Sequence, residues 1–218
     1  MNLFTLDKKG VFAALLLGIC VLFFGGSFGP YFLFVLLLFL VVSDVVTELG
    51  RNAKKLIGTY EKARGWRNVL ANGFVAFLIA LLLFANSYFH LSPRALVVAY
   101  TASMSAVMAD KFASEIGVLD GMPVMLLGFK KVAKGTSGAI TLLGTFASFF
   151  GSLLIAFSIL LLYPSLLYVV VISAAGFFGS IVDSVFGYFE EKGIGNKYTS
   201  NLACAIFGAI LAVALLAL

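Results

Sequence analysis

Charged residues are scarce in this sequence. They make up 11% of its 218 residues, against roughly 25% in soluble globular domains. So few charges cannot cover a water-exposed body of this size, which excludes an ordinary soluble fold. Hydrophobic residues make up 62% of the chain, and apolar stretches of about 20 residues, enough to cross about 30 Å of hydrocarbon, recur along it. No polar segment is long enough for a second domain, so the composition predicts one integral-membrane domain over residues 1–218.

Histidine and cysteine are nearly absent as well. The one histidine, His90, excludes a histidine-rich metal site. Cys20 and Cys204 lie in separate apolar segments without metal-ligand spacing. Both are therefore expected to be buried free thiols.

Seven apolar segments are predicted to be transmembrane helices, which makes the fold class all-α, a polytopic helix bundle. Pro30, Pro93 and Pro164 stand where a helix would begin, a position that proline tolerates. The first segment could be a signal peptide, which would leave six spans, but no small-x-small cleavage site follows it. The predicted spans are 10–26, 30–46, 68–88, 93–110, 138–162, 165–184 and 198–217.

The basic residues predict which side of the membrane each connection faces. With seven spans, all but one of the 15 Lys and Arg residues fall on one side, and Arg94 alone falls on the other. The positive-inside rule then predicts a cytoplasmic N-terminus and cytoplasmic loops at about 47–67, 111–137 and 185–197. This distribution explains the net charge of +5 without a nucleic-acid partner. The residues on the cytoplasmic side are Lys8, Lys9, Arg51, Lys54, Lys55, Lys62, Arg64, Arg67, Lys111, Lys130, Lys131, Lys134, Lys192 and Lys197.

Two predicted helices each carry one carboxylate, Asp110 or Asp183, on a face of small residues. Small faces let membrane helices approach closely, so these helices are expected inside the bundle, with the Phe- and Leu-rich first two spans toward lipid. An ionisable group at membrane depth is costly and by default marks function. The face around Asp110 also carries Ser103, Ala106, Ala113, Ser114 and Gly117, and the face around Asp183 carries Gly176, Gly179, Ser180 and Gly187.

Glu115 is a third candidate carboxylate. It follows Asp110 by five residues, about 140° around an ideal helix. Both can face one site only if the helix breaks near Ser114. Otherwise Glu115 pairs with Lys111, four residues earlier.

A basic segment containing glycine precedes the fifth predicted span. Free N–H groups at a helix start favour phosphate, glycines allow close approach, and lysines add charge. The segment does not match the Walker pattern, and a plain helix cap preceded by cytoplasmic lysines is the alternative interpretation. Its residues are Lys130, Lys131, Lys134, Gly135, Thr136, Ser137 and Gly138.

Polar residues also open the third span and mark the last. Arg67, Asn68 and Asn72 are candidate phosphate ligands, and both asparagines lie on one helix face. Their alternative role is capping and hydrogen bonding between helices. Asn201 occupies a similar face of small residues in the last span.

Four of these segments occur in the order found in the transmembrane protein 19 family, which the chain resembles over nearly its whole length. They are residues 65–73, 109–117, 134–138 and 179–184. This integral-membrane family includes the plastid phytyl-phosphate kinase, which makes phytyl diphosphate from phytyl phosphate. More distantly, the Asp-x-x-Ala and Lys-x-Gly-Thr elements look like those of CTP-using polyprenol kinases and phosphatidate cytidylyltransferases.

The resemblance implies site roles for particular residues. Asp110 and Glu115 match one acidic motif, Asp183 matches a second, and Asn201 matches the asparagine of the last helix. Residues 134–138 match the glycine–threonine segment. The chain departs from the family at Lys111, where other members have threonine.

Together these features predict a membrane-embedded kinase that transfers phosphate from a nucleoside triphosphate to an isoprenoid monophosphate such as phytyl or geranylgeranyl phosphate. The distant likeness suggests CTP. Cytidylyl transfer to a lipid phosphate and transport of a small solute are the alternatives. Asp110, Glu115 and Asp183 are the predicted catalytic residues, and the two aspartates would hold Mg²⁺. Lys130, Lys131, Lys134 and residues 135–138 would bind the nucleotide, and Arg67, Asn68, Asn72 and Asn201 the acceptor phosphate.

The predicted location follows from the same features. A multi-pass protein with its active face toward the cytoplasm is expected, with the lipid bilayer as its surroundings. The lack of a transit peptide favours a prokaryotic cell membrane over a plastid.

Overall fold

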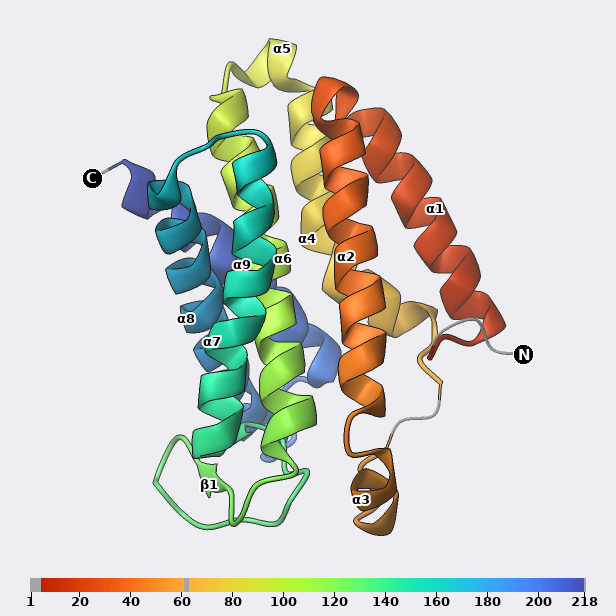
Figure 1. Cartoon of the computed structure of the whole chain (residues 1–218), viewed down its shortest axis with the longest axis vertical. Helices are drawn as coiled ribbons and strands as arrows, with labels where there is room; N and C mark the ends of the chain where they lie inside the picture. The colour runs from red at the N-terminus through yellow and green to blue at the C-terminus, as the bar shows by residue number, and fades with distance from the viewer. Residues whose placement is uncertain (1–4, 61–62, 218) are drawn as a thin grey trace.

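The computed structural model describes residues 5–60 and 63–217, so Lys62 of the basic set lies outside the described residues (Figure 1). Every apolar segment predicted to span the membrane forms a long helix, and the predicted all-α membrane bundle is confirmed. The helices are α1 (Lys8–Phe24), α2 (Gly29–Glu48), α4 (Trp66–Phe84), α6 (Pro93–Gly117), α7 (Leu142–Ala156), α8 (Leu166–Glu190) and α9 (Lys197–Leu216).

Five stretches of the described chain are long and apolar enough to cross a membrane, as judged by length and composition. They are Gly26–Glu48, Trp66–Phe84, Leu142–Leu161, Leu166–Glu190 and Lys197–Leu216.

Short elements connect the long helices. The 3₁₀ helices η1 (Gly26–Phe28) and η2 (Phe157–Leu161) lead into α2 and continue α7, and α5 (Asn86–Phe89) joins α4 to α6. Helix α3 (Arg51–Leu56) follows α2. Strands β1 (Val124–Met125) and β2 (Ala139–Ile140) pair antiparallel in the connection from α6 to α7. Figure 1 places α3 and β1 at one end of the bundle and α5 at the other.

Helix α6 is the centre of the bundle. It packs against α2, α4, α7, α8 and α9, and its residues 96–109 are all buried. Glycines let two of these helices come close: a Cβ added at Gly179 or at Gly208 would lie 2.6 or 2.8 Å from the Cβ of Ala106. Helices α8 and α9 therefore both cross α6 one turn before Asp110.

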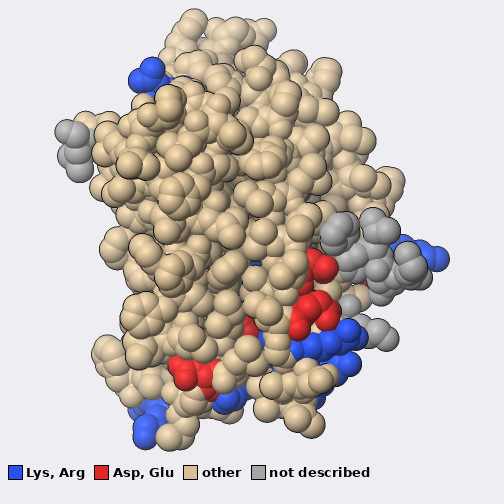
Figure 2. All heavy atoms as spheres, in the orientation of Figure 1, with Lys and Arg blue, Asp and Glu red and all other residues tan. Residues whose placement is uncertain are grey.

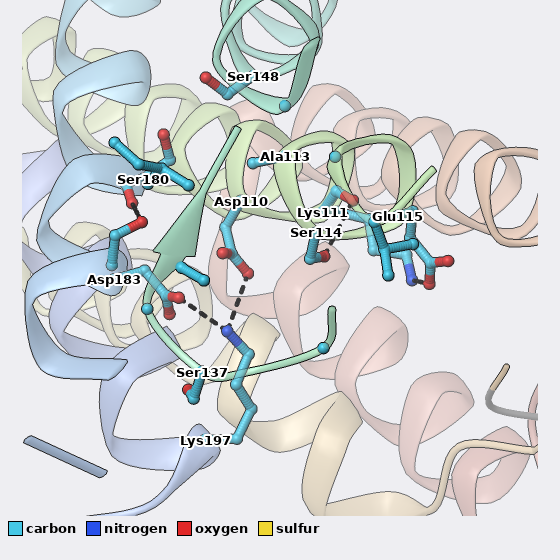
Figure 3. Close-up of a pocket in the computed structure, with 18 of the residues that line it drawn as sticks. Asp110, Lys111, Ala113, Ser114, Glu115, Ser137, Ser148, Ser180, Asp183 and Lys197 are labelled. Atoms are coloured by element: carbon cyan, nitrogen blue, oxygen red, sulfur yellow. Dashed lines mark hydrogen bonds and ion pairs between the residues drawn. The ribbon is translucent and has the colours of Figure 1, made fainter. Parts of the chain in front are cut away.

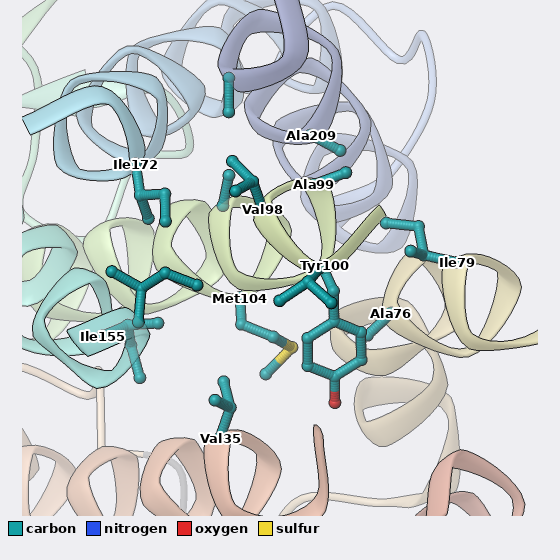
Figure 4. Close-up of a cluster of buried hydrophobic side chains, with 14 of the residues drawn as sticks. Val35, Ala76, Ile79, Val98, Ala99, Tyr100, Met104, Ile155, Ile172 and Ala209 are labelled. Carbon is teal, nitrogen blue, oxygen red and sulfur yellow. The ribbon is translucent and has the colours of Figure 1, made fainter. Parts of the chain in front are cut away.

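Apolar side chains fill the rest of the core around α6 (Figure 4). The hydroxyl groups buried there are hydrogen-bonded. Tyr100 Oη donates to the carbonyl oxygen of Phe32 at 2.8 Å, and the two rings stack. Tyr31 Oη lies 2.8 Å from Thr101 Oγ1 and 3.0 Å from Ser158 Oγ. These bonds offset the cost of taking the hydroxyls out of water and fix α2 against α6 and η2.

Helix α1 lies at the edge of the bundle and leaves much of its apolar surface uncovered. Phe12 and Ile19 are 69% and 65% exposed. This is the lipid-facing surface expected of the first span.

Several helices extend beyond the predicted spans or begin inside them. Helix α6 continues to Gly117 instead of ending at 110, and α8 continues to Glu190 instead of 184. The predicted spans covered only the apolar parts of these helices, and both helices continue beyond them into segments with charged residues. Helix α7 begins at Leu142 and not at 138, because Thr141 Oγ1 caps it by accepting the N–H of Gly144 at 3.0 Å. The connections therefore run over 49–65, 118–141 and 191–196.

Candidate functional site

A cavity of about 550 Å³ opens among α4, α6, α7, α8 and α9, next to the β1–β2 connection. Its walls combine the polar ends of these helices with residues 134–141 of that connection. Figure 2 shows most of the visible charged side chains at this end of the molecule, whereas the opposite end is almost free of them on the face in view. Charged residues from the ends of α6, α8 and α9 therefore meet in the wall of this cavity.

Asp110 and Asp183 meet at the ammonium group of Lys197 (Figure 3). Lys197 Nζ lies 2.7 Å from Asp183 Oδ2 and 3.5 Å from Asp110 Oδ2. The carboxylate side chains are 5% and 14% exposed, and that of Lys197 is 45% exposed. The close crossing at Ala106 brings the two aspartates together, since each lies near that crossing on its own helix. A cation accessible from the cavity therefore balances two buried carboxylates.

A chain of side-chain amides leads from α4 to this centre. Asn72 Nδ2 lies 3.0 Å from Asn68 Oδ1, and the amides of Asn72 and Asn201 meet at 2.6 Å. In that contact Asn201 Nδ2 donates to Asn72 Oδ1; with the Asn201 amide turned over, Nδ2 would instead lie 3.3 Å from Asp183 Oδ1. All three asparagines line the cavity. The hydrogen bond between Asn72 and Asn201 joins α4 to α9, so the interhelical bonding weighed as an alternative role is present for Asn72.

Glu115 lies at another end of the cavity, in a separate ion cluster. Its carboxylate accepts from Lys54 Nζ and Arg64 Nη2, both at 2.6 Å, and from Lys111 Nζ. The side chain of Lys54 has no exposed surface, and its ammonium also donates to the last-turn carbonyls of Val46 and Thr47 at 3.1 and 3.0 Å. The cluster therefore ties α2, α3 and the segment before α4 to α6.

The break in the helix near Ser114, which would have turned Glu115 toward Asp110, is absent. Helix α6 is continuous to Gly117. Figure 3 shows Glu115 beside Lys111 and pointing away from the Asp110–Asp183 pair. The alternative pairing with Lys111 is the one that the structure contains.

The glycine–threonine segment 134–138 lines the cavity but does not begin a helix. Strand β2 separates it from α7, and Gly135 and Gly138 have φ of +87° and +73°. The prediction that this segment forms the start of a helix is therefore wrong, whereas its place in the cavity wall agrees with a polar site. Ser137 Oγ donates to Glu190 Oε2 at 2.7 Å, and its N–H donates to Glu191 Oε1 at 2.8 Å. The segment lies along the end of α8, close to Asp183.

Three predicted site residues do not line the cavity. Lys130 and Lys131 are exposed in the hairpin connection, where the backbone of Lys130 accepts the N–H of Met125. Arg67 is exposed and stacks its guanidinium over the ring of Trp66, 5.5 Å from its centroid. Lys134 alone of the three segment lysines reaches the cavity wall.

The sequence reasoning missed Lys197 as a site residue and counted it only as a cytoplasmic charge. Its position carried a signal: it precedes Asn201 by four residues and so shares that helix face. Lys54 and Arg64 were likewise read only as charges of the second connection. Their role depends on α3 folding back under α2, which no local pattern indicates.

Gly138 is expected to tolerate no side chain, because a Cβ there would overlap the backbone of Ser184 and Tyr188 on α8. Gly193 is the matched control: its φ of +79° is similarly left-handed, but no described atom lies within 4 Å of its Cβ position. We expect Gly193→Ala to cost roughly 1–2 kcal/mol of stability from backbone strain and Gly138→Ala clearly more. Thermal unfolding and limited proteolysis of the 118–141 connection measure the difference. Equal losses in the two variants would show that the contact with α8 is unimportant.

The sequence is similar to a known protein family and to proteins of other organisms. The family described as "Integral membrane protein DUF92" matches residues 2–212. The "Uncharacterized membrane protein MJ0933" of Methanocaldococcus jannaschii is 35% identical over 210 residues, which cover 95% of this chain and 84% of the relative. Residues 2–212, which match the family, include every residue of the cavity wall.

Two further relatives are matched over shorter parts. The "Uncharacterized membrane protein sll0875" of Synechocystis is 34% identical over 127 residues, which cover 56% of this chain and 48% of the relative. "Protein PGR" of Arabidopsis thaliana is 26% identical over 178 residues, which cover 70% of this chain and 62% of the relative. No solved structure matches the chain.

Proposed function

This chain belongs to the DUF92 family of integral membrane proteins, and we propose that it transfers phosphate from a nucleoside triphosphate to an isoprenoid lipid monophosphate. The observation that carries the proposal is the convergence of two carboxylates, a lysine, a glycine-rich segment and a chain of amides on one cavity. Phosphoryl transfer requires little beyond positioning and charge neutralisation, which such a cavity supplies.

The aspartate pair fits a magnesium ion that is shared with phosphate. The described residues contain no group of three or more His, Cys, Asp or Glu side chains that could hold a metal by themselves. Mg²⁺ commonly uses one or two carboxylates and completes its coordination with waters and substrate phosphates. Asp110 and Asp183 already gather around one cation, the ammonium of Lys197. Bound there, Mg²⁺ would neutralise charge on the transferred phosphoryl group.

The nucleotide would lie against the segment 134–138. Its two left-handed glycines, Gly135 and Gly138, let phosphate oxygens approach the backbone closely, and Lys134 adds positive charge at the cavity wall. Lys197 is a further cation in the cavity wall, next to the aspartate pair. Lys130 and Lys131, which lie outside the wall, would act only through their long-range charge.

The acceptor phosphate would lie on the α4 side, where Asn68, Asn72 and Asn201 offer amide N–H donors. One of its oxygens attacks the γ-phosphorus of the nucleotide. The bond from that phosphorus to the oxygen that bridges it to the β-phosphate breaks, which gives a lipid diphosphate and a nucleoside diphosphate. A phosphate oxygen is already mostly ionised at pH 7 because the second pKa of a phosphomonoester is about 6. The reaction therefore needs no histidine base.

The cavity would face the cytoplasm in a seven-span arrangement of the long helices. Fourteen of the 15 Lys and Arg residues fall on the cavity side of such an arrangement. Nucleoside triphosphates are cytoplasmic metabolites, so this orientation exposes the cavity to its donor. Glu115, predicted to be catalytic, would act by positioning Lys111 and Arg64 at the wall.

The isoprenoid acceptor rests on the resemblance to the transmembrane protein 19 family and its phytyl-phosphate kinase. The test uses purified, folded protein with phytyl or geranylgeranyl phosphate, Mg²⁺ and either ATP or CTP. We expect the lipid diphosphate and a nucleoside diphosphate, with omission of Mg²⁺ abolishing both. Pyrophosphate and a CDP-lipid would instead identify cytidylyl transfer. No product with any of these nucleotides would contradict the proposal.

A further inference from the structure

A second, smaller cavity of about 90 Å³ lies beside the polar one, between α1, α2 and α4. Its walls are largely aliphatic and include Ala14 and Leu17 of α1, Leu33 and Leu36 of α2, Val69 of α4 and Met104 of α6. Apart from Val69, which follows Asn68 at the start of α4, these residues lie within the apolar stretches of their helices. The small cavity is therefore a mainly apolar space with polar groups in one part of its wall.

The two cavities meet at shared walls. Phe39, Arg64, Asn68 and Asn72 line both of them. On one side of these residues lie the aspartate pair and the glycine-rich segment, and on the other lie leucines and a methionine. The walls thus change from polar to aliphatic across the shared residues. A molecule with a polar group at one end and a hydrocarbon chain at the other would match that change.

We propose that the small cavity binds the phosphate-proximal carbons of the lipid monophosphate, with its phosphate on the Asn68–Asn72 side of the polar cavity. This assignment rests on the proposed function and adds to it a defined place for the chain. Burying methylene groups against aliphatic walls is favourable, and it fixes the depth and direction of the phosphate before transfer. The cavity is too small for a long chain, so the remaining carbons pass outward along α1 toward the bilayer.

Helix α1 supplies a matched pair of variants. Ala14 lines the small cavity, and the adjacent Ala13 does not. We expect Ala14→Phe to fill the cavity and weaken the binding of geranylgeranyl phosphate by about tenfold, which corresponds to the burial of roughly two methylene groups. Inorganic phosphate, which has no chain, should bind Ala14→Phe as it binds the unmodified protein. Ala13→Phe should bind both probes normally.

A photo-crosslinking measurement keeps the inference testable if Ala14→Phe does not fold. A geranylgeranyl phosphate analogue with a diazirine near its phosphate end should label Leu17, Leu33 or Met104 of the unmodified protein. Labelling confined to exposed residues such as Leu15 and Ile19 would overturn the inference, as would normal affinity of Ala14→Phe for the lipid probe. Neither result would affect the proposed reaction. Failure of the unmodified protein to bind any lipid phosphate would overturn both.

Discussion

Asp183→Asn is expected to reduce lipid diphosphate formation by about 10³-fold, the scale on which loss of one electrostatic contact at a reaction centre acts. The substitution keeps the size of the side chain and removes its charge. Asp183 lies 2.7 Å from Lys197 Nζ and is almost fully buried. Without it, only Asp110 remains to hold a divalent cation at that point. The steady-state rate with saturating nucleotide and lipid phosphate measures the loss.

Folding should survive this change, because asparagine keeps the size of the side chain and the Asp110 carboxylate still lies 3.5 Å from Lys197 Nζ. Asp120→Asn is the matched control on the same side of the bundle. Asp120 accepts the N–H groups of Gly121 and Leu143, which hold the pKa of its carboxyl below the usual range, and it does not line the cavity. The Asp120→Asn variant should therefore form lipid diphosphate at the rate of the unmodified protein. A normal rate of lipid diphosphate formation by Asp183→Asn would contradict a role for the aspartate pair in the reaction.

The dependence on Mg²⁺ distinguishes a metal site from a merely structural ion pair. If the pair holds the cation, Asp183→Asn should need a higher concentration of Mg²⁺ for half-maximal rate. A rate lowered at every Mg²⁺ concentration by the same factor would instead indicate that Asp183 acts by orienting Lys197.

Sequence patterns predicted the helices better than their ends. Length and apolar content alone placed every long helix, because a bilayer accepts only segments whose backbone groups are satisfied internally. The ends depended on contacts that composition does not contain. Helix α7 begins where Thr141 caps it, and α6 continues past Asp110 since Lys111 and Glu115 pair across one turn.

Site residues could be predicted where they lie on a helix face of small residues. They could not be predicted where they lie in the connections between helices or at the start of a helix. Asp110 and Asp183 lie on faces of small residues, so close packing of those helices was expected to bring them near each other. Lys197 was not predicted as a site residue, because a lysine at the start of a helix on the expected cytoplasmic side is already explained by the positive-inside rule. Lys54 was hidden because its contact with Glu115 joins residues 61 positions apart through a fold of the chain that has no periodic pattern.

Glu115→Gln is expected to lower the free energy of unfolding by about 3–5 kcal/mol, the usual result of removing one partner from a buried ion pair. Lys54 has no exposed side-chain surface, so its buried ammonium would lose the negative charge that balances it and keep only uncharged acceptors such as the carbonyls of Val46 and Thr47. The measurement is unfolding of the purified protein by heat or by a denaturing detergent. Glu48→Gln is the control, because Glu48 and its partner Arg51 are 40% and 47% exposed and such surface pairs contribute at most about 1 kcal/mol.

The same variant decides whether Glu115 takes part in the reaction or supports the wall of the cavity. Support predicts that the loss of stability and the loss of activity appear together. It also predicts that replacing both partners, Lys54→Met with Glu115→Met, restores part of the stability, because the fully buried ammonium of Lys54 is then removed together with its carboxylate. A direct role predicts the reverse: Glu115→Gln would stay as stable as the unmodified protein and still lose turnover. The three cations around one carboxylate favour support, since the contacts with Lys54, Arg64 and Lys111 already occupy both of its oxygens.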